Sequence, residues 1–156
     1  MIKIKSRIID ALYRHAIAEF PSECCGVVMG KKGDPNSFEQ SFPCRNLQNQ
    51  KHTEDSQNFP RTAETAYFLD PQDLFRIQKL SREKGMEMKV IYHSHVNVGA
   101  YFSAEDKKQA AYEGNPIYPG VYYLVIDVTK DSVRGAKLFE WDPTKKDFSE
   151  ISWQTV

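Results

Sequence analysis

The sequence predicts a mixed α/β protein in which helices pack on a β-sheet. Short apolar runs with the composition of buried strands alternate with segments whose apolar residues recur at helical spacing. The chain has 156 residues, of which 40% are hydrophobic and 12% aromatic. These numbers suit a single domain over residues 1–156 with a substantial core.

The first third of the chain is predicted to form one helix and two strands. Apolar residues recur at helical spacing over Ile8–Phe20, Ser6 is a candidate cap, and Pro21 ends the segment. The glycine-bounded run Cys25–Gly30 indicates a buried strand. A second strand is expected near Phe38–Pro43, beyond a turn-rich stretch.

The middle of the chain is predicted to start with a long polar loop. Residues 46–65 are rich in Gln, Asn, Thr and Asp, and loops of this length in small domains are more often functional or mobile than inert. A short strand is expected at Tyr67–Leu69, and a helix from Asp70 to about Lys84. Pro71 suits the first helical position, and Gly85 suits the end.

The rest of the chain returns to strands. Met88–Tyr92 is a predicted strand that ends at two histidines, and Ser103–Glu113 is a predicted helix stopped by Gly114. Three further strands are expected at Val121–Val128, Arg134–Trp141 and Phe148–Trp153. The order of the strands in the sheet does not follow from these patterns.

Composition limits the possible partners. The 21 basic residues balance 21 acidic ones, so overall charge favours neither nucleic acid nor an anionic membrane. No apolar run reaches the roughly 18 residues of a membrane helix, and no signal-peptide segment follows the N-terminus. Cys24, Cys25 and Cys44 lack the spacing of a disulfide scaffold. We therefore expect a soluble, cytoplasmic protein.

A candidate metal site lies between residues 93 and 106. His93 and His95 stand at i and i+2, so in a strand both imidazoles project to one face. After seven intervening residues, Ser103 and Asp106 follow at the start of the predicted helix. Two imidazoles and one carboxylate supply three zinc ligands and leave the fourth position to water, as in catalytic zinc sites.

Ser103 and Asp106 also have the spacing of a helix N-cap. The two interpretations are compatible, because a carboxylate in the first helical turn has a fixed position. The Ser103 hydroxyl is then a candidate donor to a developing oxyanion. Glu23 is the candidate general acid/base, and the alternative for it is an ordinary exposed glutamate between helix and strand.

These residues resemble the signature of the JAMM (JAB1/MPN+) metalloprotease family. The motifs that carry the resemblance are His93-x-His95-x7-Ser103-x-x-Asp106, Glu23-x-Cys25-Gly26 and Phe68-x-Asp70-Pro71. The resemblance implies an α/β (α+β) fold with a curved mixed β-sheet flanked by helices, the cytidine-deaminase-like JAMM/MPN fold. It also implies zinc held by His93, His95 and Asp106, with Glu23 as the acid/base residue.

Members of that family hydrolyse amide or isopeptide bonds after the C-terminal glycines of ubiquitin-like proteins. The resemblance therefore implies a zinc-dependent (iso)peptidase of the minimal prokaryotic type, acting on a ubiquitin-like or sulfur-carrier protein that ends in Gly-Gly. A glycine tail has no side chains to recognise, so pairing with a sheet edge is expected. Tyr101 and Phe102 are candidate contacts for the tail, and burial as loop anchors is their alternative.

Val96 and Phe102 stand where many family members carry proline, which leaves the loop conformation and the substrate subtype open. The run Val96-Asn97-Val98 does not resemble the Pro-Ser-Gly run of the RadC-like branch. A non-catalytic zinc-containing scaffold for ubiquitin-like proteins is the main alternative function. A nucleobase deaminase would need His-x-Glu followed by Pro-Cys-x-x-Cys, and the sequence has no such segment.

Overall fold

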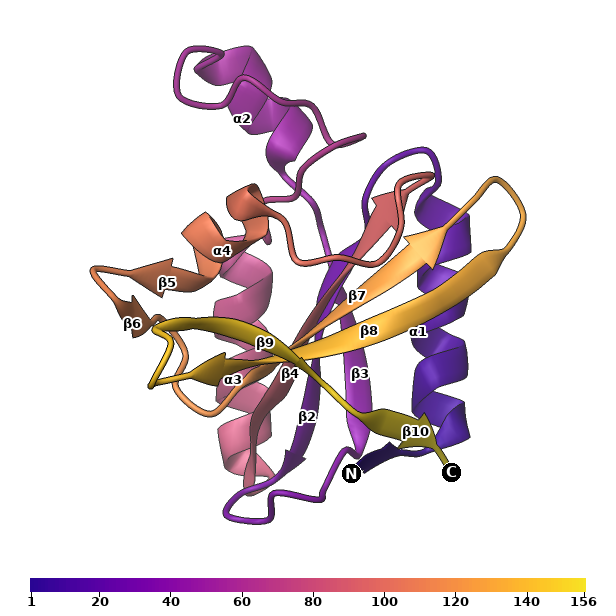
Figure 1. The fold of residues 1–156 in the computed structure, drawn as a ribbon, viewed down its shortest axis with the longest axis vertical. Helices are drawn as coiled ribbons and strands as arrows, with labels where there is room; N and C mark the ends of the chain where they lie inside the picture. The colour runs from indigo at the N-terminus through magenta and orange to yellow at the C-terminus, as the bar shows by residue number, and fades with distance from the viewer.

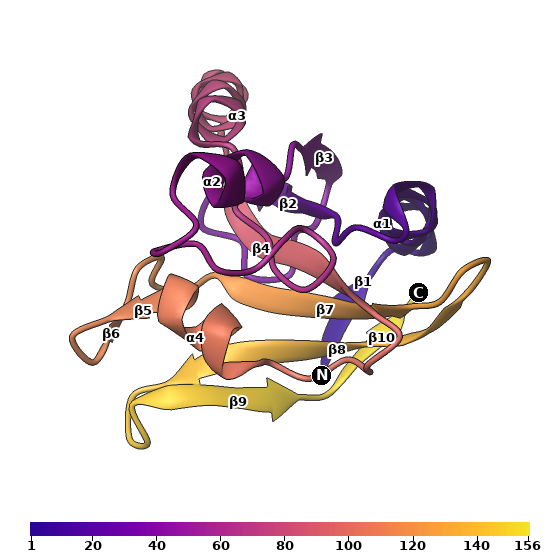
Figure 2. The ribbon, with the colours of Figure 1, turned by 90° about the horizontal axis from the view of Figure 1, so that it is seen from above.

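The computed structural model describes residues 1–156, and its centre is a twisted sheet of six strands in the order β3-β2-β4-β7-β8-β9 (Figures 1 and 2). Only β4 and β7 pair in parallel, and the other four pairings are antiparallel. The predicted mixed sheet is confirmed. The strands are β2 (Cys25–Lys31), β3 (Gln40–Cys44), β4 (Met86–Val96), β7 (Tyr122–Val128), β8 (Val133–Asp142) and β9 (Asp147–Ile151).

Helices cover both faces of the sheet, so the protein has two apolar cores. On one face, α1 (Ser6–Glu19) packs a stripe of buried residues against the sheet, and on the other lie α3 (Pro71–Glu83) and α4 (Ala104–Ala110) (Figure 2). The α1 stripe is Ile8, Ile9, Leu12 and Ala16, which has the helical spacing seen in the sequence. None of the helices combines the length and apolar composition required to cross a membrane.

The two ends of the chain lie side by side (Figure 1). Strand β1 (Ile2–Ile4) pairs in parallel with β10 (Trp153–Thr155), in a register that joins Ile2 to Trp153. The predicted last strand, Phe148–Trp153, is in fact two strands separated at Ser152. The break lets the chain leave β9 and pair with its own N-terminus.

Residues 46–69 differ most from the prediction. Helix α2 (Gln48–Glu54) lies inside the predicted loop and stands above the sheet in Figure 1. The predicted strand Tyr67–Leu69 is wrong, since only an isolated bridge joins Asn46 to Leu69. The backbone carbonyl of Tyr67 accepts instead from the Gln109 side chain at 2.7 Å, and of the three residues only Tyr67 is fully buried.

The predicted helix from residue 70 is confirmed, because Asp70 caps α3 by accepting from the Gln72 backbone N–H at 2.9 Å, and Gly85 takes a φ of 69° beyond its end. Two other helix predictions need correction. Ser6 is the first residue of α1 and no side chain caps that helix. Helix α4 ends at Ala110, and a small hairpin, β5 (Ala111–Tyr112) and β6 (Asn115–Pro116), replaces its predicted last turn.

Candidate metal centre

His93 and His95 lie on the central strand β4, which extends to Val96 instead of ending before the histidines as predicted. Their ring atoms Nε2 lie 3.2 Å apart, and both side chains are buried. On either side, His93 is paired in register with Cys25 of β2 and Val125 of β7. The two imidazoles therefore project from the interior of the sheet.

The first turn of α4 brings Asp106 to the histidines. Its Oδ2 lies 3.1 Å from Nε2 of His93 and 3.0 Å from Nε2 of His95. The Ser103 hydroxyl accepts from the Asp106 backbone N–H at 3.0 Å, and Oδ2 accepts from the Ser103 N–H at 2.9 Å. The predicted helix cap is confirmed, and the same cap orients the carboxylate toward the imidazoles.

The spacing of these three side chains fits a small metal ion. Tetrahedral zinc with bonds of about 2.0–2.1 Å sets its ligand atoms roughly 3.3 Å apart, and the atoms of His93, His95 and Asp106 are 3.0–3.2 Å apart. A second, wider set joins Glu23 to the two histidines, with all ligand atoms within 4.8 Å of one another. The donor set of imidazole and carboxylate suits zinc.

The protonation states also fit metal binding. Burial lowers the pKa of His93, against the opposing charge of Asp106, so its ring stays neutral. Burial disfavours ionised Asp106, but His93, His95 and the Ser103 N–H outweigh this and hold its pKa well below the usual range. Nδ1 of His95 lies 3.1 Å from the Gly99 carbonyl. Because a carbonyl only accepts, Nδ1 carries the proton and Nε2 keeps its lone pair for a metal.

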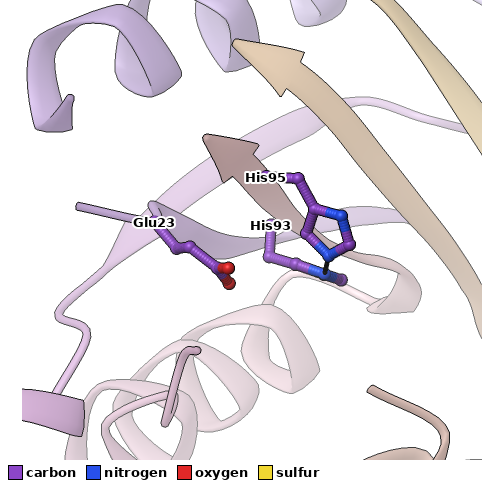
Figure 3. Close-up of side chains that lie close together, drawn as sticks. All are labelled: Glu23, His93 and His95. Carbon is purple, nitrogen blue, oxygen red and sulfur yellow. Dashed lines mark hydrogen bonds between the residues drawn. The ribbon is translucent and has the colours of Figure 1, made fainter. Parts of the chain in front are cut away.

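Glu23 lies in the loop before β2 and extends toward the two histidines (Figure 3). It is only 4% exposed, so the alternative of an ordinary exposed glutamate is wrong. Its Oε1 is buried without a hydrogen-bond partner. Burial, and next the charge of Asp106, raise the pKa of Glu23 to about 9, while Arg61 acts in the opposite direction.

Other polar residues hold this arrangement, and the sequence interpretation did not single them out. Ser94 points to the opposite face from its histidine neighbours, and its hydroxyl accepts from the Cys24 N–H at 2.8 Å. The Asn46 side chain donates to the Glu23 carbonyl at 2.9 Å. Strand alternation is a signal that would place Ser94 on the face opposite the histidines, whereas no local signal pairs Asn46 with Glu23. The ring of His93 is stacked on Tyr67, with centroids 4.4 Å apart.

The two aromatic residues before Ser103 have different environments. Phe102 is 8% exposed and packs among Tyr123, Phe139 and Phe148, which supports its alternative role as a loop anchor. Tyr101 is 50% exposed and lies edge-on to His95, with centroids 4.7 Å apart. Of the two, only Tyr101 presents an accessible ring beside the cluster.

The fold and this cluster define a class of α+β domain in which a central strand presents a candidate metal centre of histidines and carboxylates. The chain belongs to the prokaryotic homologs of the JAB domain, because the model of that family matches residues 5–141. The family inferred from the motifs is therefore confirmed.

Two relatives illustrate the range of proteins that this chain is similar to. The CysO-cysteine peptidase of Mycobacterium tuberculosis is 26% identical over 134 residues, which cover 86% of this chain and 77% of that protein. Tail tip assembly protein K of Escherichia phage N15 is 34% identical over 106 residues, 68% of this chain. The match spans only 35% of the phage protein's length.

Solved structures agree with the fold. A protein of Desulfitobacterium hafniense aligns over 100% of this chain and 93% of its own, with a TM-score of 0.72 and 23% identity. A JAB1/MPN domain protein of Archaeoglobus fulgidus aligns over 100% and 99%, with a TM-score of 0.54 and 14% identity. These similarities establish the architecture.

Proposed function

We propose that the protein is a zinc-dependent peptidase that hydrolyses the amide bond after the C-terminal glycines of a ubiquitin-like or sulfur-carrier protein. One observation carries the proposal: the buried, unpartnered carboxylate oxygen of Glu23 lies beside a closely spaced set of three ligand side chains. A structural metal site needs no such additional carboxylate. A hydrolytic site needs one to move a proton.

The residues that would hold zinc are His93, His95 and Asp106, whose ligand atoms form the tighter of the two sets. When bound, zinc supplies Lewis acidity and makes water acidic enough to lose a proton near neutral pH. Glu23 stands further out, which suits a residue that exchanges protons and does not bind the metal.

Glu23 would accept a proton from water and deliver it to the departing amine nitrogen. In the metal-free protein its pKa of about 9 keeps the carboxyl protonated at neutral pH. A cation beside it favours the ionised form, which is the form that accepts a proton. The Ser103 hydroxyl already accepts from Asp106, so its own hydrogen is available to donate to a carbonyl oxygen that gains negative charge.

The substrate class rests on kinship. The mycobacterial relatives are CysO-cysteine peptidases, and this name supports a sulfur-carrier protein as the substrate here. We infer that a C-terminal Gly-Gly tail reaches the cluster and that exposed Tyr101 contacts it. All three cysteines are free and buried, which supports action in the reducing cytoplasm.

Metal analysis combined with a cleavage assay tests the proposal. The substrates are carrier proteins extended beyond Gly-Gly, either by one residue or by an isopeptide-linked lysine peptide. We expect one zinc per chain, cleavage that a chelator abolishes, and a Glu23→Gln variant that keeps zinc but loses most turnover. Stoichiometric zinc without cleavage of any substrate would instead identify a binding scaffold. Retained turnover in Glu23→Gln would refute the role of that residue.

A further inference from the structure

Arg61 lies in the stretch between α2 and α3, which the fold holds close to Glu23. The Ala63 carbonyl accepts from the Glu23 N–H at 2.7 Å, which ties residue 63 to the loop of the acid/base residue. The Arg61 carbonyl accepts from the buried side chain of Gln48 at 2.9 Å. The backbone is therefore fixed at Arg61 and at Ala63, and Ala63 is bonded directly to the loop that carries Glu23.

The guanidinium of Arg61 is exposed and has no carboxylate partner. Four other arginines, Arg7, Arg45, Arg76 and Arg134, form salt bridges. Arg61 makes only one long side-chain contact, 3.4 Å from Nη1 to the Thr65 carbonyl. Its charge is nonetheless close enough to act against the raised pKa of Glu23. It is therefore an unpaired cation close to the residue that would protonate the leaving group.

The chemistry of the leaving group explains why a cation is useful there. Glu23 can protonate the departing nitrogen only within hydrogen-bond distance. In a single C-terminal residue, the α-carboxylate carbon lies about 2.5 Å from that nitrogen, across two covalent bonds. A lysine side chain released from an isopeptide bond carries no negative charge near its nitrogen. A carboxylate within a few ångströms of Glu23 therefore distinguishes the two leaving groups.

We propose that Arg61 binds the free α-carboxylate of the leaving residue, so that the enzyme removes one C-terminal amino acid from its carrier in preference to an isopeptide-linked lysine. This specificity rests on the proposed function of the same site. Arginine suits the role because its planar guanidinium donates two parallel hydrogen bonds to a carboxylate. A charge-assisted contact of this kind is worth about a tenfold change in affinity.

The test uses one sulfur-carrier protein extended beyond Gly-Gly by a single alanine, prepared as the free acid and as the carboxamide. We expect the zinc-loaded enzyme to show a KM about tenfold lower for the free acid. Arg61→Gln abolishes this preference, and Arg61→Lys restores part of it. Arg14→Gln is the matched control, an exposed arginine of α1 that forms no salt bridge. Binding of both forms to Glu23→Gln, measured by calorimetry, gives the same ratio without turnover.

Three other results would overturn the inference. Equal KM values for the acid and the carboxamide in the wild type would refute the proposed specificity, and the proposed peptidase activity would still stand. A loss of kcat in Arg61→Gln that is equal for both forms, with a shifted pH profile, would mean that Arg61 only tunes Glu23. Cleavage of neither form by zinc-loaded enzyme would refute the proposed function itself, and the inference with it.

Discussion

The side-chain amide of Asn46 donates a 2.9 Å hydrogen bond to the backbone carbonyl of Glu23. The same amide group also donates to the Ala66 carbonyl at 3.2 Å and accepts from the N–H groups of Gln48 and Phe68. One side chain thus joins the start of α2 at Gln48, and the chain beyond α2 at Ala66 and Phe68, to the loop that carries the proposed acid/base residue. Its full complement of hydrogen bonds is satisfied in a single arrangement.

Asn46→Ala is expected to destabilise the protein by about 1–3 kcal/mol, because it leaves buried backbone groups without partners. Turnover should fall as well, since the Glu23 loop loses its tether. Thermal unfolding and a cleavage assay measure the two effects. Asn58→Ala is the control, because Asn58 is exposed and its side chain bonds only to Asp55. Equal effects of the two substitutions would contradict the tether.

Glu23→Gln is expected to stabilise the metal-free protein above neutral pH. The pKa of Glu23 rises from 4.5 to about 9 on folding, so the native state binds more protons than the unfolded state between these values. Stability therefore falls as pH increases through that window, and the glutamine variant lacks this contribution. Melting curves in chelator from pH 5 to 9 should show a Tm difference that grows with pH.

The control for this pH series is Glu64→Gln, which removes an exposed carboxylate from the stretch between α2 and α3. Its melting temperatures should follow those of the wild type at every pH. If the wild type were as stable as Glu23→Gln at pH 8, the buried Glu23 carboxyl would not lower the stability of the folded protein at that pH.

The substitutions Asp106→Asn and Ser103→Ala distinguish the contribution of these residues to zinc binding from their contribution to the helix cap. Asparagine can still accept from the Ser103 N–H, but it lacks the charge of a zinc ligand, so zinc affinity should fall by more than the roughly 10–100-fold typical of an outer-shell change. Ser103→Ala removes the cap to the Asp106 N–H and should cost about 1 kcal/mol while zinc content is kept. Zinc titration and unfolding report the two losses; full zinc affinity in Asp106→Asn would exclude Asp106 as a ligand.

Phe102→Ala should be strongly destabilising, by about 3–5 kcal/mol, because it empties a site among three aromatic rings. Tyr101→Ala should change stability by only about 0.5 kcal/mol, since that ring is half exposed, and should instead raise KM. Denaturant unfolding and steady-state kinetics distinguish them. The opposite pattern would reverse the assignment of anchor and substrate contact.

The sequence by itself determined the candidate metal ligands, as far as their positions depend on local geometry. The spacing of His93 and His95 on a strand and the position of Asp106 in a helix cap are properties of neighbouring residues, and the structure has both features. The helix after Asp70 is equally predictable from the sequence, because a proline at its start and a glycine beyond its end are local signals.

Only the tertiary structure decided what surrounds those candidate ligands. Antiparallel pairing of β2 with β4 brings Glu23 beside histidines seventy residues away and buries it, and no local pattern contains that pairing. The polar stretch that resembled a loop contains α2 and is held by Asn46, whose partners lie at both ends of the segment. Burial and long-range hydrogen bonds arise only when distant segments pack. The environment of Glu23, and the absence of a salt-bridge partner for Arg61, are therefore properties of the folded chain that the sequence does not show.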